Sequence, residues 1–346
     1  MTTSTGTDRA ADTGGLLPPG VSLDFEQTVP RAIAHRRQIG EVFVADSVQR
    51  GEDDFHLSFQ VPRAHSLWSD HPAGHHDPFA SAEAARQAIF VLLHRHLGVP
   101  VGLPFSLQRI TFRVTEPAAY RVRDGWPLQG YLHYRVADRR NRGSDVVGMV
   151  LRGEMEIGGR PAMELTAELA FMSQQDYDVF RAFQRAQKPV ATAARTPHSP
   201  LDAARVGRRD PGNVVIGEAP GAAGPLLVPD PRHPALFDHE YDHMPGPAIA
   251  EGLRQAALDA ACRAGALPSP RALAVGFEAA FLDFGEFEAD LECTAEVGTA
   301  TADGRVPVAV GLHQFGKAIV TGSVELLPEP GAPASPAHPH AHAKEF

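Results

Sequence analysis

The sequence predicts an α+β protein built twice, in which each half curls an antiparallel sheet around one long helix. A length of 346 residues with 43% hydrophobic content allows about two ordinary domains, each with its own core. Each half contains two short strand-like segments, one apolar helix and then three or four alternating strands. The pattern Glu-x-x-Arg-Gln occurs at residues 83–87 and again at residues 251–255, in the most hydrophobic part of each half.

The first half opens with two alternating segments, residues 41–47 and 53–61, which predict two strands. A helix is expected over residues 79–97, because Gly98 and Pro100 follow it and both are typical of a helix end. Four more strands are predicted after it, at residues 106–115, 128–136, 146–157 and 161–172.

The second half repeats this plan, with strand-like segments at residues 213–218 and 225–228. A helix is expected over residues 247–264, ending at Gly265. Gly252 lies inside this helix and is expected to weaken it by roughly 1 kcal/mol relative to alanine. Four strands follow, at residues 273–284, 289–297, 306–313 and 318–327.

These elements divide the chain into a first domain, residues 24–185, and a second domain, residues 207–328. The linker between them, residues 186–206, mixes Ala, Thr and Pro. The first end, residues 1–23, is rich in Thr, Gly, Ala and Pro, and the last, residues 329–346, carries Pro, Ala and scattered His, so we expect both to be disordered.

The composition excludes several classes of partner. A net charge of -10 and a pI near 5.9 argue against nucleic acid or an anionic membrane surface. Cys262 and Cys293 are the only cysteines, and both lie in apolar patterns, so no disulfide framework is expected. Because the sequence shows neither a signal peptide nor an apolar run long enough to span a bilayer, we predict a cytoplasmic protein.

The repeated charged pattern is the candidate active-site signature. The helix over residues 79–97 is apolar nearly all round and must be enclosed. Glu83, Arg86 and Gln87 lie at i, i+3 and i+4, on one face of it. An ordinary surface pair would contribute only about 0.2–0.5 kcal/mol. That interpretation is the weaker one, because burying charge is expensive and the arrangement recurs.

The motifs around these helices resemble known acyl-thioester enzymes. Pro245-Gly246 followed by Glu251 and Gln255 is similar to the helix start of the hot-dog fold β-hydroxyacyl-ACP dehydratases. A longer ordered set of motifs resembles the A-factor synthase (AfsA) family of tandem hot-dog proteins. That set comprises His35-Arg36, Glu41-Val42-Phe43-Val44, Pro62-Arg63-Ala64-His65-Ser66, His76-Asp77-Pro78, Glu83-x-x-Arg86-Gln87, Val206-Gly207-Arg208, Phe237-Asp238-His239, Asp242-His243-x-Pro245-Gly246 and Glu251-x-x-Arg254-Gln255.

The resemblance implies a tandem (double) hot-dog fold, with two antiparallel sheets each wrapped around a long central helix and paired as an internal pseudo-dimer. It also implies an acyltransferase of γ-butyrolactone (A-factor) biosynthesis, which makes an autoregulator signal for secondary metabolism. Such an enzyme condenses a β-ketoacyl-acyl carrier protein with dihydroxyacetone phosphate to a β-ketoacyl ester, which cyclises to a butenolide phosphate. No cofactor is expected, and a separate enzyme would reduce the ring, because no dinucleotide fingerprint is present.

Physical requirements of acyl transfer assign roles to the repeated residues. Glu83 and Glu251 are candidates for general base or substrate orientation. Arg86 and Arg254 are candidate phosphate clamps, because guanidinium groups bind phosphate oxygens in bidentate fashion. Their alternative role is to neutralise the adjacent glutamate. Gln87 and Gln255 lie on the same helix face and are candidate substrate-binding residues.

Helix starts and loop histidines complete the expected site. Gly246 would let a substrate carbonyl approach the free N–H groups of a helix N-terminus, a place that Asp77 takes in the first half. His243 in the adjacent loop is a further substrate-binding candidate. By analogy with hot-dog dimers, the resemblance implies the crossed catalytic pairs His65 with Glu251 and His239 with Glu83.

Metal binding is not expected. The loop groups His71, His75, His76 and Asp77, and Asp238, His239, Asp242 and His243, contain suitable residue types. Neither group has a second ligand pair at a recognisable helical or knuckle spacing, and loop histidines near a helix start also suit dehydratase-like catalysis.

Two other functions remain open. A hot-dog acyl-ACP or acyl-CoA dehydratase or thioesterase would use the same Glu and His but has no phosphate for Arg86 and Arg254 to hold. A non-catalytic acyl-binding protein would keep an apolar tunnel without any demand on the charged residues. The acyl chain length, the thioester carrier (ACP or CoA), the product (lactone, furan or butenolide), the number of working sites and the oligomeric state are also open.

Overall fold

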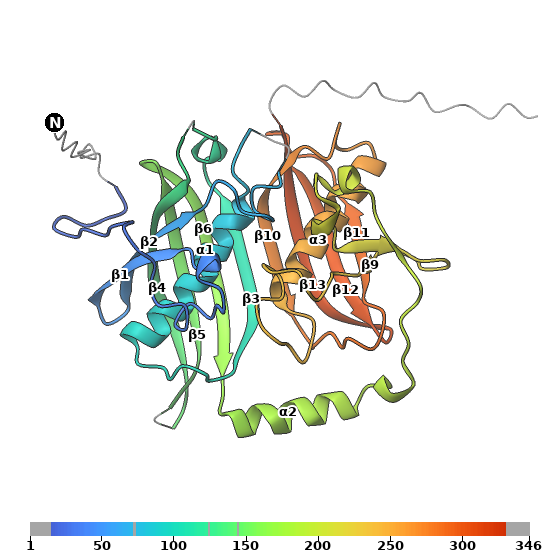
Figure 1. The fold of residues 1–346 in the computed structure, drawn as a ribbon, viewed down its shortest axis with the longest axis horizontal. Helices are drawn as coiled ribbons and strands as arrows, with labels where there is room; N and C mark the ends of the chain where they lie inside the picture. The colour runs from blue at the N-terminus through green and yellow to red at the C-terminus, as the bar shows by residue number, and fades with distance from the viewer. Residues whose placement is uncertain (1–14, 72–73, 124, 144, 330–346) are drawn as a thin grey trace, which may run out of the picture.

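The computed structural model describes residues 15–71, 74–123, 125–143 and 145–329 (Figure 1). Most of the two ends expected to be disordered, residues 1–14 and 330–346, lie outside the described residues. In the part of the chain that is described, no helix is long and apolar enough to cross a membrane.

Each half of the chain contributes its own antiparallel strands. Those of the first half are β1 Val44–Gly51, β2 Asp54–Val61, β3 Phe105–Val114, β4 Leu128–Arg142, β5 Asp145–Ile157 and β6 Arg160–Phe171. Those of the second half are β7 Ser199–Pro200, β8 Ile216–Glu218, β9 Leu226–Leu227, β10 Ala272–Phe281, β11 Glu292–Val297, β12 Val306–Gln314 and β13 Lys317–Pro328. Short 3₁₀ turns lie at Ile39–Glu41, Pro117–Tyr120, Val190–Thr192, Ala203–Val206 and Pro211–Asn213.

The two half-sheets join edge to edge. Among the described residues the strand order is β1-β2-β4-β5-β6-β3-β10-β13-β12-β11-β9-β8-β7. The junction is the antiparallel pair β3 and β10, with Phe112 opposite Phe277. The expected pair of sheets is therefore one continuous sheet, in which each half retains its own helix.

Helices α1 (Pro78–Val91) and α3 (Gly246–Arg263) lie on the same face of this sheet, one in each half (Figure 1). Helix α1 begins after Asp77, whose carboxylate accepts a hydrogen bond from the Phe79 N–H at 2.9 Å. It continues as a π-helical turn, Leu92–His96. Both helices are buried over most of their surface, as the nearly all-round apolar pattern of residues 79–97 predicts for α1.

Gly252 in α3 has a packing role that the sequence did not reveal. A Cβ atom at this position would lie 2.3 Å from Cδ1 of Leu227. The glycine therefore allows strand β9 to approach the helix backbone, and the expected propensity cost is the smaller effect.

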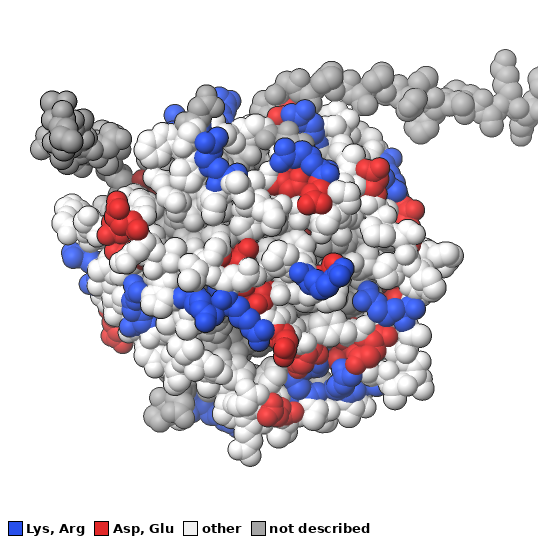
Figure 2. All heavy atoms as spheres, viewed as in Figure 1, with Lys and Arg blue, Asp and Glu red and all other residues white. Residues whose placement is uncertain are grey.

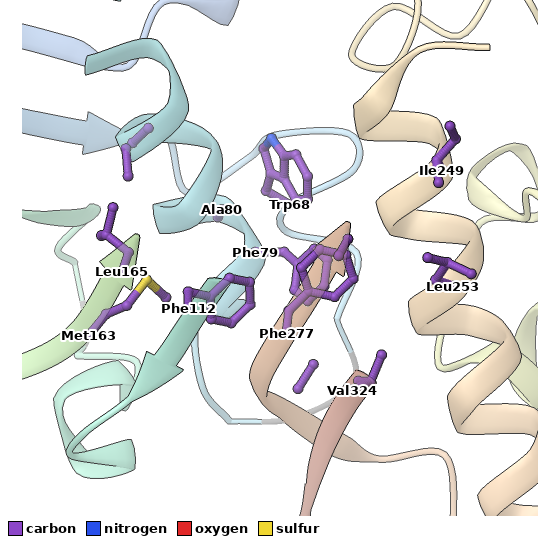
Figure 3. Close-up of a cluster of buried hydrophobic side chains, with 14 of the residues drawn as sticks. Trp68, Phe79, Ala80, Phe112, Met163, Leu165, Ile249, Leu253, Phe277 and Val324 are labelled. Atoms are coloured by element: carbon purple, nitrogen blue, oxygen red, sulfur yellow. The ribbon is translucent and has the colours of Figure 1, made fainter. Parts of the chain in front are cut away.

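Aromatic side chains fill the core where the two halves meet. The ring of Phe79 in α1 lies 5.2 Å from that of Phe112 and 5.3 Å from that of Phe277, edge to face in both cases. Trp68 lies beside this group (Figure 3). The halves therefore share a hydrophobic contact as well as a strand pair.

A third helix, α2 (Gln174–Ala186), precedes the linker and was not predicted. It runs along the lower edge of the molecule in Figure 1. Its buried Arg181 donates to Glu286 at 2.9 Å and to Asp242 at 2.8 Å. Lys188, just beyond the helix, also donates to Glu286 at 2.9 Å. These ion pairs attach the link between the halves to the second half.

Acidic and basic side chains are interspersed over the face shown in Figure 2, and neither sign covers it. The net charge of -10 is therefore not concentrated there into one acidic field.

Candidate active sites

The first charged cluster centres on Glu83 in the middle of α1. Arg86 donates to its two carboxylate oxygens, from Nε at 2.8 Å and from Nη2 at 2.9 Å. Arg36, which precedes the sheet, donates to the same carboxylate from the other side. Gln87 donates from Nε2 at 2.9 Å. Glu83 thus orients two guanidinium groups at once.

The second cluster repeats this arrangement around Glu251 in α3. Arg254 donates to Glu251 from Nε at 3.0 Å and from Nη2 at 2.8 Å. Arg208 donates from Nε at 3.1 Å, and Gln255 donates to the same carboxylate. Arg36 and Arg208 are therefore equivalent residues, which the search for helix motifs missed. The sequence signal that could have found them is an arginine at a similar distance before each helix glutamate, 47 residues for Arg36 and 43 residues for Arg208.

The two glutamines hold the backbone rather than offering free groups to a substrate. Gln87 accepts from the Phe43 N–H at 2.9 Å and donates to the Glu41 carbonyl at 2.8 Å. Gln255 makes the equivalent bonds, accepting from the Val215 N–H at 3.0 Å and donating to the Asn213 carbonyl at 2.8 Å. Each side chain therefore fixes the segment just before a strand, β1 in the first half and β8 in the second.

Both glutamates are held in the ionised form. Burial opposes ionisation of Glu83, but the charges of Arg36 and Arg86 outweigh it and lower the pKa to about 2. Burial likewise opposes ionisation of Glu251, whose pKa is nevertheless lowered by Arg208 and Arg254. A carboxylate this acidic and fully hydrogen-bonded is a poor proton acceptor at neutral pH. Of the two expected roles, orientation is the one that the geometry favours.

His65 contacts Glu41 rather than Glu251. Its Nδ1 accepts from the Leu67 and Trp68 N–H groups, which leaves Nε2 to donate to Glu41 at 3.1 Å. His233 repeats this pattern, with Nδ1 accepting from two backbone N–H groups and Nε2 donating to Asn213 at 2.9 Å. We therefore assign His65 to fixing its loop. The expected pairing with Glu251 is not formed.

His239 lies beside the first cluster, and His71 is its counterpart beside the second. Both stand six residues after the loop-fixing histidine of their half. Burial lowers the pKa of His239, and the nearby charges of Arg36 and Arg86 lower it further. His71 is buried, and burial lowers its pKa to about 4. His239, which is only partly buried, is therefore a neutral imidazole near two guanidinium groups.

His35 also lies near the first cluster and was not among the expected site residues. Its ring stacks on that of Phe90, with centroids 4.1 Å apart, and its Nε2 lies 2.7 Å from Nε2 of His94. Burial and the neighbouring His94 lower the pKa of His35 to about 3. Gly207 stands at the equivalent position before Arg208, so this histidine has no counterpart in the second half.

The two clusters differ most in the residue that precedes the long helix of the opposite half. Asp77, which caps α1, also accepts from Nη1 of Arg254 at 3.3 Å. Glu83 and Glu251 are 168 residues apart, and the residue 168 positions after Asp77 is Pro245, which has no carboxylate. In the Glu251 cluster two guanidinium groups are bonded to two carboxylates, those of Glu251 and Asp77. In the Glu83 cluster two guanidinium groups are bonded to the single carboxylate of Glu83. Asp70 and Asp238 approach the respective clusters equivalently and do not alter this difference.

The arginine side chain of the Glu83 cluster is also more exposed to solvent than that of the Glu251 cluster. The side chain of Arg86 is 20% exposed, whereas that of Arg254 is 2% exposed. The first turn of α3 receives no side-chain cap from Pro245, and a Cβ at Gly246 would meet no atom within 4 Å. The Glu83 cluster thus has an accessible cation, and α3, the long helix of the other half, begins without a side-chain cap. At the Glu251 cluster the cation is buried, and the long helix of the other half, α1, is capped by Asp77.

His243 belongs to a different group of side chains. Its Nδ1 lies 2.6 Å from Asp242, the carboxylate that Arg181 of α2 also binds. Its ring packs edge to face on Phe284 at 4.4 Å. We therefore assign it to the contact between α2 and the start of α3.

Comparison with known proteins agrees with this double arrangement. The family model of the A-factor biosynthesis hotdog domain (AfsA) matches residues 21–172 and 190–328. A 2-oxo-3-(phosphooxy)propyl 3-oxoalkanoate synthase of Streptomyces coelicolor is 29% identical over 298 residues, which cover 85% of this chain and 91% of that protein. A synthase of the same name from Streptomyces virginiae is 33% identical over 230 residues, covering 66% and 76%.

Solved structures show a weaker likeness. An oleoyl thioesterase (putative) from Lactobacillus plantarum is 11% identical with a TM-score of 0.47, covering 81% of this chain and 97% of that one. This likeness is too weak to bear on activity. The family match covers both halves in order, and the chain belongs to the AfsA family of A-factor biosynthesis hotdog proteins.

Proposed function

We propose that this protein transfers a β-ketoacyl group from an acyl carrier protein thioester to the hydroxyl of dihydroxyacetone phosphate, as a 2-oxo-3-(phosphooxy)propyl 3-oxoalkanoate synthase. The names of its relatives support this reaction. The observation that carries it here is the surplus of positive charge at the Glu83 cluster, where Arg36 and the partly exposed Arg86 share one carboxylate. A phosphate is the group that such a surplus would bind.

We further propose that the Glu83 cluster is the working site and that the Glu251 cluster is structural. At Glu251 the carboxylate of Asp77 already occupies the place that a phosphate oxygen would take on Arg254. The same carboxylate also caps α1 and so blocks its N-terminus as an anion site. Among the described residues, Arg86 is bonded to the carboxylate of Glu83, and no side chain caps the start of α3.

The roles follow from charge and position. Arg86 and Arg36 bind the phosphate, and Glu83 orients them. His239 accepts the proton of the substrate hydroxyl as its oxygen attacks the thioester carbonyl. The N–H groups at the start of α3, beside Gly246, stabilise the resulting oxyanion. Collapse of this intermediate forms the ester and expels the thiolate, which takes the proton back from His239. Intramolecular condensation then closes the butenolide phosphate.

Mass spectrometry of the purified protein with a β-ketoacyl-ACP mimic tests this proposal. A phosphorylated ester or butenolide that needs both the thioester and dihydroxyacetone phosphate is the expected product. Loss or hydration of the acyl group without the triose phosphate would instead identify a thioesterase or dehydratase. Absence of any turnover, with the thioester bound, would identify an acyl-binding protein.

A further inference from the structure

Two histidines and an aspartate meet on the outer face of the sheet, away from both helices. His56 in β2 is the cross-strand partner of His133 in β4. Asp54 lies two residues before His56, and side chains two apart in a strand share a face. Phe55 and Leu57 between and beside them point into the core. The three polar side chains therefore lie on the opposite face from α1.

The polar atoms of the three side chains lie close together. The two imidazole rings stack with centroids 4.3 Å apart and an angle of 3° between their planes, so one ring must turn for both Nε2 lone pairs to point at the same ion. Oδ1 of Asp54 lies 3.1 Å from Nε2 of His56 and 3.3 Å from Nε2 of His133. A tetrahedral zinc site with bonds of about 2.0–2.1 Å separates its ligand atoms by about 3.3 Å. The observed separations match that spacing.

The protein itself leaves this group incompletely satisfied. The side chains of His56 and His133 are only 3% and 8% exposed. Within the described residues, Asp54 Oδ1 and His133 Nε2 are buried and have no hydrogen-bond partner. Buried polar atoms without partners are costly and uncommon. A cation between the three side chains would satisfy both atoms.

A cavity of about 710 Å³ gives access to the site from the outer face. His133 lines it, together with Arg135, Arg152, Glu154 and Glu164. Glu154 is the cross-strand partner of His133 on β5, so acidic side chains continue the row of ligands across the sheet. An ion held by three protein ligands would keep its remaining coordination position toward this cavity.

We propose that Asp54, His56 and His133 bind one divalent transition-metal ion, with Zn²⁺ as the ion that this ligand set fits. Two imidazoles and one carboxylate with an open position are a common zinc ligand set. The ion would cross-link β2 to β4 on the face opposite the Glu83 cluster, and it takes no part in the proposed acyl transfer.

Metal titration of the full-length, untagged and chelator-treated protein tests this proposal. Co²⁺ is added while visible absorption is followed, and Zn²⁺ binding is measured by calorimetry. We expect one tight equivalent, with the intense absorption of four-coordinate Co²⁺ that Zn²⁺ abolishes. His133→Gln and Asp54→Asn should each weaken binding roughly tenfold or more. Zn²⁺ should raise the Tm of the parent protein and not that of the variants.

The sequence near the C-terminus supplies the control. His338, His340 and His342 alternate there and could bind metal independently. Their triple replacement by alanine should leave the tight equivalent intact. The proposal fails if that triple variant loses the equivalent, or if Asp54→Asn keeps the parent affinity. Asp54 is 38% exposed, so its asparagine variant remains informative even if His133→Gln does not fold.

Discussion

Arg86 and Arg254 occupy equivalent positions in the two repeats, and replacing each by glutamine should have opposite consequences. Arg254 is 2% exposed and is bonded to both Glu251 and Asp77. Its removal leaves two buried carboxylates with one fewer cation, which costs about 3–5 kcal/mol of unfolding free energy. Arg86 shares Glu83 with Arg36 and is 20% exposed, so Arg86→Gln should cost only about 1 kcal/mol.

Activity should follow the reverse order. A hydrogen bond to a charged group contributes about 1.5–3 kcal/mol, which corresponds to a loss of about 10- to 150-fold in kcat/KM for dihydroxyacetone phosphate in Arg86→Gln. Arg254→Gln should retain parental kcat/KM per folded molecule, because Arg254 is bonded to the carboxylates of Glu251 and Asp77 and lies over the Phe79 ring.

Urea unfolding and product formation at varied triose phosphate concentration measure both quantities on the same preparations. The reasoning would be refuted if Arg86→Gln kept parental kinetics, or if Arg254→Gln lost its activity while its unfolding curve stayed unchanged. Either result would move the working site to the Glu251 cluster or give both clusters a share.

Three further predictions concern single residues. His239→Ala should lower kcat about 10²- to 10⁴-fold, whereas the control His71→Ala should keep turnover per folded molecule. The pKa of His239 is lowered from 6.5, so the rate of the parent protein should fall only below pH 6.5. If the rate of His239→Ala still fell in acid, His239 would be excluded as the base. Gly252→Ala should lower the unfolding free energy by about 1–3 kcal/mol in urea, because the new Cβ would collide with Leu227, and a stabilised variant would contradict this packing. The pKa of Glu83 is lowered from 4.5 to about 2, so its ion pairs stabilise the fold fully above pH 4.5 and lose up to about 3 kcal/mol of stabilisation as the pH falls to 2. Glu83→Gln should flatten this part of the plot of unfolding free energy, measured in urea, against pH. An unchanged slope would show that Glu83 is not the titrating group.

Much of the fold was predictable because its hydrophobic pattern is regular. The two long helices were expected at residues 79–97 and 247–264 and lie at Pro78–Val91, with its π-helical extension, and Gly246–Arg263. The missed helix α2 lacks that pattern. Its buried residue is Arg181, whereas Val179 and Phe183 are 66% and 65% exposed. Tyr177 and Phe180, three residues apart, do form a small apolar side that packs on Phe284, but the rest of the helix is largely polar.

The candidate site was predictable where its residues share one helix and not where they meet across the fold. Glu83 and Arg86 stand at helical spacing, so their pairing follows from local geometry. Arg36 joins them only through the packing of a preceding loop, 47 residues away. The choice of His65 as a catalytic partner failed for a related reason. Its Nδ1 is occupied by two backbone N–H groups of its own loop, a local turn that residue types alone do not reveal.

The joining of both halves in one chain has an evolutionary consequence. In a dimer of identical subunits, every substitution alters both symmetric sites, so a residue that stabilises one site at the expense of chemistry disables the other as well. Linkage of the two halves in one chain removes that constraint, and the β3–β10 strand pair keeps the halves together. Asp77 and Pro245 can therefore differ, and the equivalent position is a structural anchor in one repeat and an uncapped helix end in the other.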